Sequence, residues 1–197
     1  MRRYFILNKP YGVLSQFTRE EPHHRTLGDL FRFPPDVYPL GRLDRDSEGL
    51  LIVTNDKKLN HLLLDPTHAH RRTYLVQVEG IPGQEALAHL QNGVSIRLGK
   101  TSHTTLPARA RLLLQAPGIP ERDPPIRYRK SVPDSWIELE LKEGKNRQVR
   151  RMCAAVGFPV LRLIRFKIEK LELQDIESGK VREMDGKMLY DLLGIKR

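Results

Sequence analysis

The sequence predicts an α+β fold built on a mixed, largely antiparallel sheet flanked by helices. Segments with the alternating pattern of strands and segments with the pattern of amphipathic helices interleave irregularly along the chain, whereas a parallel sheet is built from regularly alternating strands and helices. The chain has 197 residues, of which 39% are hydrophobic, so it can bury a core as one large domain or as two small lobes.

Local signals place the expected elements along the chain. Asp56 can cap a helix, Pro82 can open one and Gly93 can end it, while residues 136–141 alternate apolar and polar side chains as strands do. Strands are expected at residues 4–8, 50–54, 73–79, 94–98, 108–114, 136–141, 160–168 and 181–184. Helices are expected at residues 26–31, 56–64, 82–92, 146–156 and 187–193.

Two basic loops are expected between these elements. Residues 94–98 and 108–114 are predicted to pair with each other across a loop at residues 99–107. Residues 116–134 combine five prolines with several arginines and a lysine, which indicates an extended basic loop and not a linker between domains.

Charge and composition restrict the classes of function. The formal net charge is +10, which favours a polyanionic partner such as a nucleic acid, with general solubility as the alternative explanation. Cys153 is the only cysteine, which excludes an internal disulfide and suits a reducing, cytoplasmic environment. No apolar run is long enough for a membrane span or a signal peptide. His68 and His70 alone do not make a metal site, and no cofactor-binding motif is found, so neither metal nor cofactor is expected.

The segment from Gly41 to Leu51 carries the strongest chemical signal. It holds three carboxylates, from Asp44, Asp46 and Glu48, beside two arginines, and an apolar strand follows at once. A strand of this kind holds the segment rigidly at the edge of a core, where catalytic groups can be positioned. A carboxylate beside arginine stays ionised and suits a nucleophile or a base, but a surface ion pair is the simpler explanation for each of the three. Spacing alone does not choose among them.

A basic helix forms the second dense segment. Around residues 146–156, Val149 and Met152 fall on one side and Arg147, Arg150 and Arg151 on the other. Lys145 and Asn146 are expected at its N-terminus, where free N–H groups suit a phosphate. The cationic side contains no acid, which favours nucleic-acid binding over an ordinary solvated face. In the strand that follows, Arg162 and Arg165 leave opposite faces, and at least one should pair with an acid or anion.

These residues resemble the motifs of RNA pseudouridine synthases. Gly41-Arg42-Leu43-Asp44 with Ser47-x-Gly49-Leu50-Leu51 is similar to the catalytic motif of the family, and residues 145–152 with 157–163 resemble later motifs of the branch that modifies ribosomal RNA. Residues 9–18, 124–127 and 135–136 most resemble the large-subunit rRNA pseudouridine synthase E subfamily. The resemblance extends from residue 8 to about residue 168.

The resemblance implies a role for each matching residue. Asp44 matches the essential aspartate, Tyr74 the tyrosine that stacks on the target base and assists removal of its C5 proton, and Arg150 the arginine that pairs with the aspartate. Arg42 matches a residue that helps to displace the flipped base, and Leu163 one that lines the pocket. Binding of RNA is expected from Arg45, Lys145, Asn146, Arg147, Gln148 and Arg151. Arg72 stands where the family usually has lysine, which keeps the charge.

The resemblance also implies the whole molecule's activity. It predicts a catalytic domain over residues 1–197 with two lobes around a central active-site cleft, without the S4-like RNA-binding domain with which many relatives begin. The enzyme would isomerise a specific uridine of large-subunit (23S) ribosomal RNA to pseudouridine, as a cytoplasmic monomer without a cofactor. The alternatives are the same chemistry on small-subunit rRNA or tRNA, and a non-catalytic rRNA-binding assembly factor.

Overall fold

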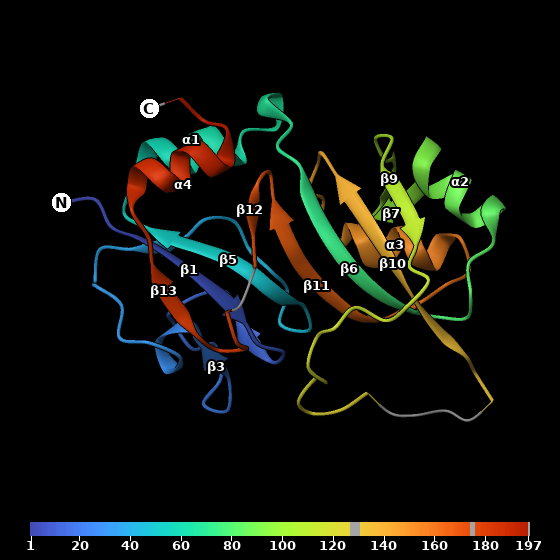
Figure 1. Ribbon diagram of the computed structural model, residues 1–197, viewed down its shortest axis with the longest axis horizontal. Helices are drawn as coiled ribbons and strands as arrows, with labels where there is room; N and C mark the ends of the chain where they lie inside the picture. The colour runs from blue at the N-terminus through green and yellow to red at the C-terminus, as the bar shows by residue number, and fades with distance from the viewer. Residues whose placement is uncertain (127–130, 174–175, 197) are drawn as a thin grey trace. The chain divides into compact units, whose positions relative to one another are not determined.

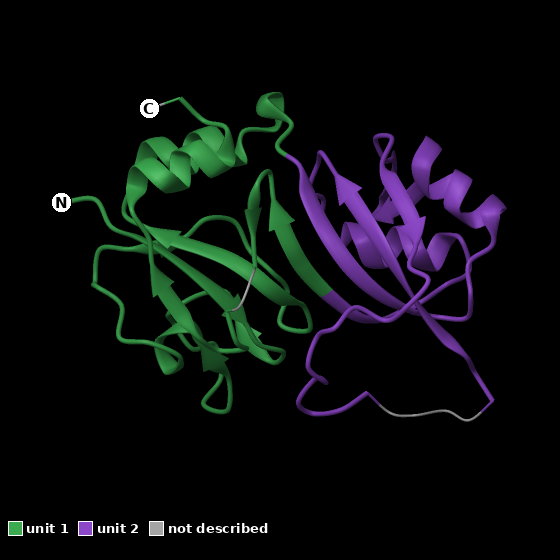
Figure 2. Ribbon diagram, viewed as in Figure 1, with its two compact units in different colours: residues 1–70, 164–197 green, residues 71–163 purple. Residues whose placement is uncertain are grey.

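The computed structural model describes residues 1–126, 131–173 and 176–196. The chain divides into two compact units, which Figure 2 shows in different colours. Unit 1 comprises residues 1–70 and 164–197, and unit 2 comprises residues 71–163. Strands of both directions and helices occur among the described residues (Figure 1), so the predicted α+β class is confirmed.

Unit 1 contains a mixed sheet around strand β5 (Glu48–Thr54). Strand β1 (Tyr4–Lys9) runs antiparallel to β5, and the middle of β11 (Val160–Ile168) pairs with the start of β5 in parallel. Smaller strands complete the sheet: β4 (Tyr38–Pro39) on β5, β12 (Leu171–Glu172) on β11 and β13 (Val181–Glu183) on β1. A separate parallel pair is formed by β2 (Val13–Leu14) and β3 (Arg25–Thr26).

Both faces of β5 are covered, and all seven of its residues are buried. Phe5 and Leu7 of β1 and Leu51 and Val53 of β5 pack into one apolar cluster with Val13, Leu27 and Val37. Helices α1 (Lys57–Leu64) and α4 (Gly186–Leu193) of Figure 1 bury Leu59, Leu63, Leu189, Tyr190 and Leu193, and the Tyr190 hydroxyl donates to Asp56, the cap of α1. Two short 3-10 helices, η1 (Leu27–Asp29) and η2 (Pro66–His68), complete the unit. The continuous apolar run of β5 therefore reflects burial on both faces.

Unit 2 contains an antiparallel sheet in the order β6 (Arg72–Glu79), β10 (Asp134–Leu141), β9 (Arg109–Leu112). Strands β7 (Ser95–Leu98) and β8 (Thr101–Thr104) make a hairpin beside it. Helices α2 (Gln84–Asn92) and α3 (Gln148–Ala155) contribute Leu87, Leu90, Val149, Met152 and Cys153 to the core of the unit. The alternating residues Ile137, Leu139 and Leu141 of β10 face that core, as the sequence pattern predicted.

Two local expectations were wrong. Residues 95–98 pair with 101–104, and 109–112 pair instead with β10, because Gly99 at φ 62° allows a two-residue turn that closes the hairpin. The helix expected from residue 146 begins at Gln148, whereas the short helix expected at 26–31 forms as the 3-10 helix η1 with Thr26 as its cap. In the long loop between β9 and β10, the basic residues Arg127, Arg129 and Lys130 lie outside the described residues.

Candidate active site

The segment around Asp44 forms a tight turn just ahead of β5. The Ser47 N–H donates to the Asp44 carbonyl at 3.0 Å, which closes the turn, and Leu40 N–H donates to Ile52 O at 2.8 Å. Asp44 is half-buried at this turn, whereas Glu48 has entered β5 and is only 5% exposed. The acids at positions 44, 46 and 48 therefore do not share the single face that an extended segment would give them. Arg42 and Arg45 are exposed on either side of Asp44.

A buried serine holds the residue immediately before Asp44. Ser15 is 4% exposed, and its hydroxyl donates to Leu43 O at 2.8 Å while accepting from Leu43 N–H at 3.1 Å. Two residues further along the turn, the Arg45 carbonyl accepts from the Gly12 N–H at 2.8 Å. The segment at residues 12–15 thus fixes the backbone on both sides of Asp44. The sequence pattern gave no reason to choose Ser15 for this role, although it lies within the stretch that resembles subfamily E.

Lys9 is a buried lysine in the same unit. The sequence pattern did not mark it as a residue of the site. It is fully buried, and its Nζ donates to Val13 O at 2.7 Å and Pro10 O at 3.0 Å. The pKa of Lys9 is lowered to about 7, chiefly by burial; the charges of Glu48, Asp46 and Asp44 oppose this shift, and the nearby Arg165 adds to it. The acid-rich segment therefore acts on a lysine whose charged form is disfavoured by burial.

Gly49 lets β11 approach the beginning of β5. Its φ is +107°, and a Cβ at this position would lie 2.4 Å from the Arg165 carbonyl oxygen, which only glycine avoids. Arg165 is 4% exposed, and its Nε donates to Leu50 O at 2.8 Å. Arg162 is 8% exposed and donates to Pro120 O at 2.9 Å. Both of these hydrogen bonds go to backbone carbonyls, so the pairing of Arg162 or Arg165 with an acid or anion stays a prediction.

Unit 2 holds Tyr74, Leu163 and Arg150. Tyr74 on β6 and Leu163 on β11 belong to the same core cluster, with 9% and 6% exposure. Arg150 lies on α3, is half-buried, and donates to Val160 O at 3.5 Å. Cys153 on the same helix is fully buried, and burial raises the pKa of its thiol to about 12, which agrees with a core residue and not a nucleophile.

The basic segment ahead of α3 is a loop and not the first turn of the helix. Lys145, Asn146 and Arg147 are exposed, and Arg147 adopts a left-handed conformation with φ of 51° at the cap position. Arg151 donates to Asn146 O at 3.1 Å and to Arg97 O at 2.5 Å, so it ties the loop to β7. This geometry gives Arg151 a supporting task in addition to its charge.

Gln148 lies inside the protein, where the sequence had suggested an exposed RNA contact. It is 4% exposed; its Oε1 accepts from Lys145 N–H at 2.8 Å and its Nε2 donates to Glu143 Oε1 at 2.7 Å. Glu143 also accepts from the Leu106 N–H and faces His103 Nε2 at 3.1 Å. Burial raises the pKa of Glu143, but these hydrogen bonds outweigh it and hold the pKa below its usual range. Through Gln148, the Glu143 carboxylate therefore helps to hold the loop that carries Lys145 and Arg147.

Within the described part of the chain, no group of three or more histidine, cysteine, aspartate or glutamate side chains is arranged to hold a metal ion. None of the helices in that part is long and apolar enough to cross a membrane.

Comparison with known proteins shows the family. Residues 3–155 match the family model described as RNA pseudouridylate synthase. The chain is 57% identical over 164 residues to a protein of Xanthomonas axonopodis pv. citri named "Ribosomal large subunit pseudouridine synthase E", covering 83% of this chain and 84% of that one. A protein of the same name from Xanthomonas campestris pv. campestris is 51% identical over 92% of this chain and 95% of its own length.

A solved structure shows the same likeness in three dimensions. The "Crystal structure of pseudouridylate synthase" matches 98% of this chain and 74% of its own, with a TM-score of 0.78 and 28% identity. The residues matched by the family model include the whole of the Asp44 turn. The chain therefore belongs to the RNA pseudouridylate synthase family and is an RNA pseudouridine synthase, an isomerase.

Proposed function

We propose that this enzyme converts a specific uridine of large-subunit ribosomal RNA to pseudouridine, with Asp44 as the essential carboxylate. The observation that carries the proposal is the rigid turn that holds Asp44 half-buried between Ser15 and the start of β5. The 57% identity to a protein named for the large ribosomal subunit supports the choice of RNA.

The reaction is an isomerisation and needs no external reactant. The bond between N1 of the base and C1′ of the sugar breaks, the base rotates, and C5 bonds to C1′. The proton lost from C5 is balanced by a proton gained at N1, so no atoms or electrons are exchanged with another molecule. Asp44 acts at the sugar, where an ionised carboxylate can work either as a nucleophile or as a base.

Base flipping precedes this chemistry, because C1′ and C5 are not accessible in a stacked helix and unstacking costs a few kcal/mol. Arg42 is exposed beside Asp44 and has the length to occupy the space that the base leaves. We assign the stacking on the flipped base and the removal of the C5 proton to Tyr74, the neighbouring pocket wall to Leu163, and the pairing with the catalytic carboxylate to Arg150.

RNA binding is assigned to exposed cations. Arg45, Lys145 and Arg147 are exposed and can neutralise phosphates, with Asn146 as a neutral neighbour. Gln148 and Arg151 support the loop through the contacts described above, so their replacement should weaken RNA binding by misplacing Lys145 and Asn146. We further propose that the enzyme acts as a cytoplasmic monomer.

The test is a pseudouridine map of ribosomal RNA from cells that lack this protein. One site in large-subunit rRNA should be lost, restored by the wild-type gene and not restored by Asp44→Asn. Asp46→Asn is the matched control, because it removes a carboxylate from the same turn and should restore the site. Loss of a site in small-subunit rRNA or tRNA would overturn the proposed RNA, and no lost site would favour a non-catalytic binder. Restoration by Asp44→Asn would overturn the assigned catalytic residue.

A further inference from the structure

A cavity of about 400 Å³ lies within unit 2, beneath the long loop between β9 and β10. This size falls in the range of about 300–1,000 Å³ that is usual for small-ligand sites. Trp136 of β10 and its cross-strand partner Gln77 of β6 line it. Because Ile137 and Leu139 of β10 face the core of the unit, Trp136 lies on the opposite face of the sheet and is half-buried there.

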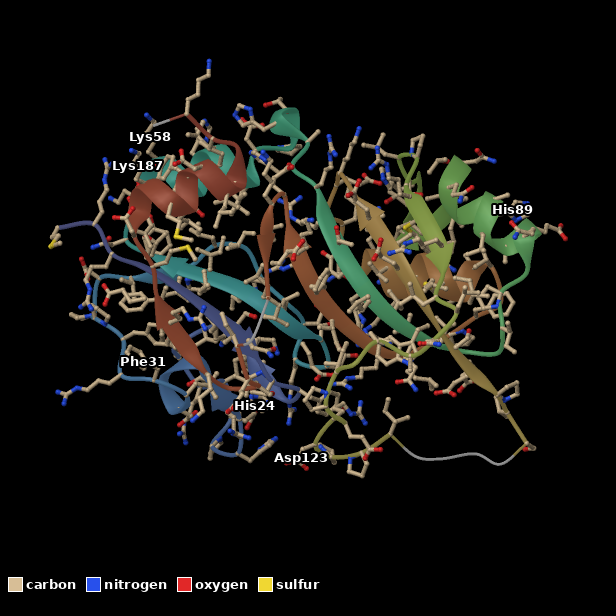
Figure 3. The ribbon with its side chains drawn as sticks, in the orientation of Figure 1. His24, Phe31, Lys58, His89, Asp123 and Lys187 are labelled. Carbon is tan, nitrogen blue, oxygen red and sulfur yellow. The ribbon has the colours of Figure 1, made fainter. Side chains whose placement is uncertain are left out.

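The described part of the loop is fastened over this face. At its start, Leu113 N–H donates to Trp136 O at 2.8 Å, and at its end Gly80 N–H donates to Pro133 O at 2.7 Å. Between these ends, the nearly buried guanidinium of Arg162 donates to Pro120 O at 2.9 Å. Figure 3 labels Asp123, which lies further along the loop. A loop held at three points by backbone and arginine contacts can keep the cavity open for a ligand.

The lining combines an indole with polar groups. Ile119 and Ile126 supply apolar walls, while Glu121 and Asp134 contribute carboxylates to the same lining as Trp136. Gln77 donates to Asp134, and Glu121 is exposed and makes no hydrogen bond to another of the residues the structure describes. Carboxylates accept hydrogen bonds from amino groups and repel phosphates. Among the lining residues that the structure describes, three are acids and two are arginines.

We propose that this cavity binds an unstacked nucleobase of the RNA substrate, guanine in preference to uracil. The proposal rests on the proposed function, because it takes the substrate to be RNA. A base can stack on the indole, as bases of single-stranded RNA do on aromatic side chains. Guanine presents the N1–H and the N2 amino group side by side, which match the two oxygens of one carboxylate, whereas uracil presents a single N–H between two carbonyls.

The binding can be followed directly, because Trp136 is the only tryptophan of the chain. The fluorescence of the full-length protein should change saturably on titration with GMP. The apparent Kd for GMP should be about fivefold or more below that for UMP, the lower end of what one good base contact contributes. Glu121→Gln should reduce this preference, because one acceptor oxygen becomes a donor, and its surface position should leave folding intact. Leu114→Ala is the control, since Leu114 lies in the same loop, is 99% exposed and is not part of the cavity lining.

A second measurement uses the RNA itself. Trp136→Ala should raise the KM for RNA about fivefold or more with little change in kcat, because a stacking contact made equally in the bound substrate and in the transition state adds binding alone. Fluorescence that is unchanged by GMP, or equal affinities for GMP and UMP, would overturn the pocket even if the wild-type enzyme forms pseudouridine. Absence of pseudouridine formation by the wild type would overturn the proposed function instead, so the two failures are distinguishable.

Discussion

Replacing Ser15 with alanine tests how Asp44 is held in place, separately from the catalytic role that we propose for its carboxylate. Ser15 does not belong to the acid-rich turn, but its hydroxyl forms two hydrogen bonds with the backbone of Leu43, the residue before Asp44. In Ser15→Ala, the Leu43 N–H and carbonyl lose these partners in a position that is 7% exposed. The Asp44 turn should then become less well ordered while its carboxylate remains present.

Two buried hydrogen bonds set the size of the effect. Each contributes about 0.5–1.5 kcal/mol net, so the free energy of unfolding should fall by about 1–3 kcal/mol. A typical domain is stable by about 5–15 kcal/mol, so the variant should still fold. Misplacement of a catalytic group by about 1 Å can cost about 100-fold in rate, and we expect kcat to fall by about tenfold or more.

Thr54→Val is the matched control at the far end of β5. The Thr54 hydroxyl is also buried, donates to Arg3 O at 2.5 Å and accepts from Asp56 N–H at 3.1 Å. Urea unfolding should therefore show similar losses of stability in both variants, whereas single-turnover pseudouridine formation at saturating RNA should slow only in Ser15→Ala. A normal rate in Ser15→Ala, or an equal slowing in Thr54→Val, would refute the positioning role.

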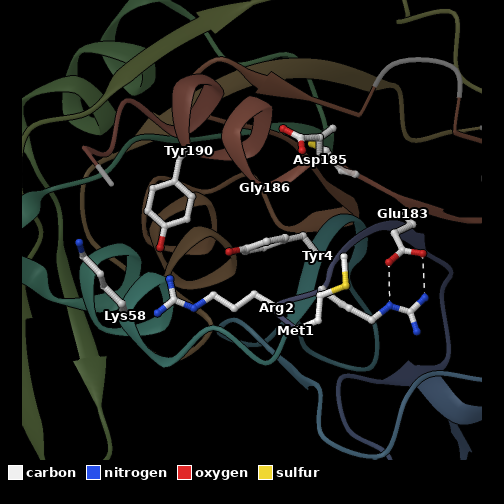
Figure 4. Close-up of a pocket in the computed structure, with 10 residues that line it drawn as sticks. Met1, Arg2, Tyr4, Lys58, Glu183, Asp185, Gly186 and Tyr190 are labelled. Atoms are coloured by element: carbon white, nitrogen blue, oxygen red, sulfur yellow. Dashed lines mark hydrogen bonds and ion pairs between the residues drawn. The ribbon is translucent and has the colours of Figure 1, made fainter.

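Two further predictions concern stability in unit 1. Gly49→Ala should lower the free energy of unfolding by about 3 kcal/mol or more, because it adds backbone strain to a clash with the Arg165 carbonyl. Gly118→Ala is the control and should be nearly neutral in urea unfolding, since a Cβ at Gly118 would have no neighbour within 4 Å. Burial raises the pKa of Asp56, but hydrogen bonds from Tyr4 and Tyr190, whose hydroxyls converge beside Arg2 in Figure 4, outweigh it and hold the pKa below its ordinary value. The ionised Asp56 therefore stabilises the folded state above the ordinary carboxyl pKa of about 3.9, and this contribution is lost as pH falls through the lower pKa of the folded state. In Asp56→Asn, the free energy of unfolding measured in urea should fall less between about pH 5 and pH 3 than it does in the wild type. An unchanged pH dependence of the free energy of unfolding would contradict this prediction.

The strands and helices with strong periodicity could be predicted from the sequence. The apolar run Leu50–Val53 predicts a buried strand, and in the structure both faces of that strand are covered. Asp56 caps α1, as predicted, by accepting hydrogen bonds from Lys58 N–H and Leu59 N–H. The hairpin at 95–104 could not be predicted in the same way, since β8 is made of threonine, serine and histidine and lacks an apolar alternation. Its only signal was the glycine of a two-residue turn.

The supporting residues of the site were harder to predict than its charged residues. Asp44 and the arginines stand out because charge beside an apolar strand is unusual. Ser15 acts through backbone atoms of Leu43, 28 residues along the chain, so this contact depends on how the fold brings the two segments together. Gln148 acts through its neighbours Lys145 and Glu143. A sequence pattern contains residue types and spacing, and neither specifies which hydroxyl meets which carbonyl.

The three carboxylates of the turn differ in environment and therefore in what they can do. Glu48 is buried at the start of β5, and together with Asp46 and Asp44 it favours the charged form of Lys9, which burial alone would make neutral. Removing any one of the three should thus lower the pKa of Lys9. Asp44 is distinguished by its position in the turn, where backbone bonds hold both neighbours, Leu43 and Arg45. A dense acidic segment in a basic protein then has a structural task, since its carboxylates oppose the effect of burial on Lys9, beside the catalytic task that we propose for Asp44.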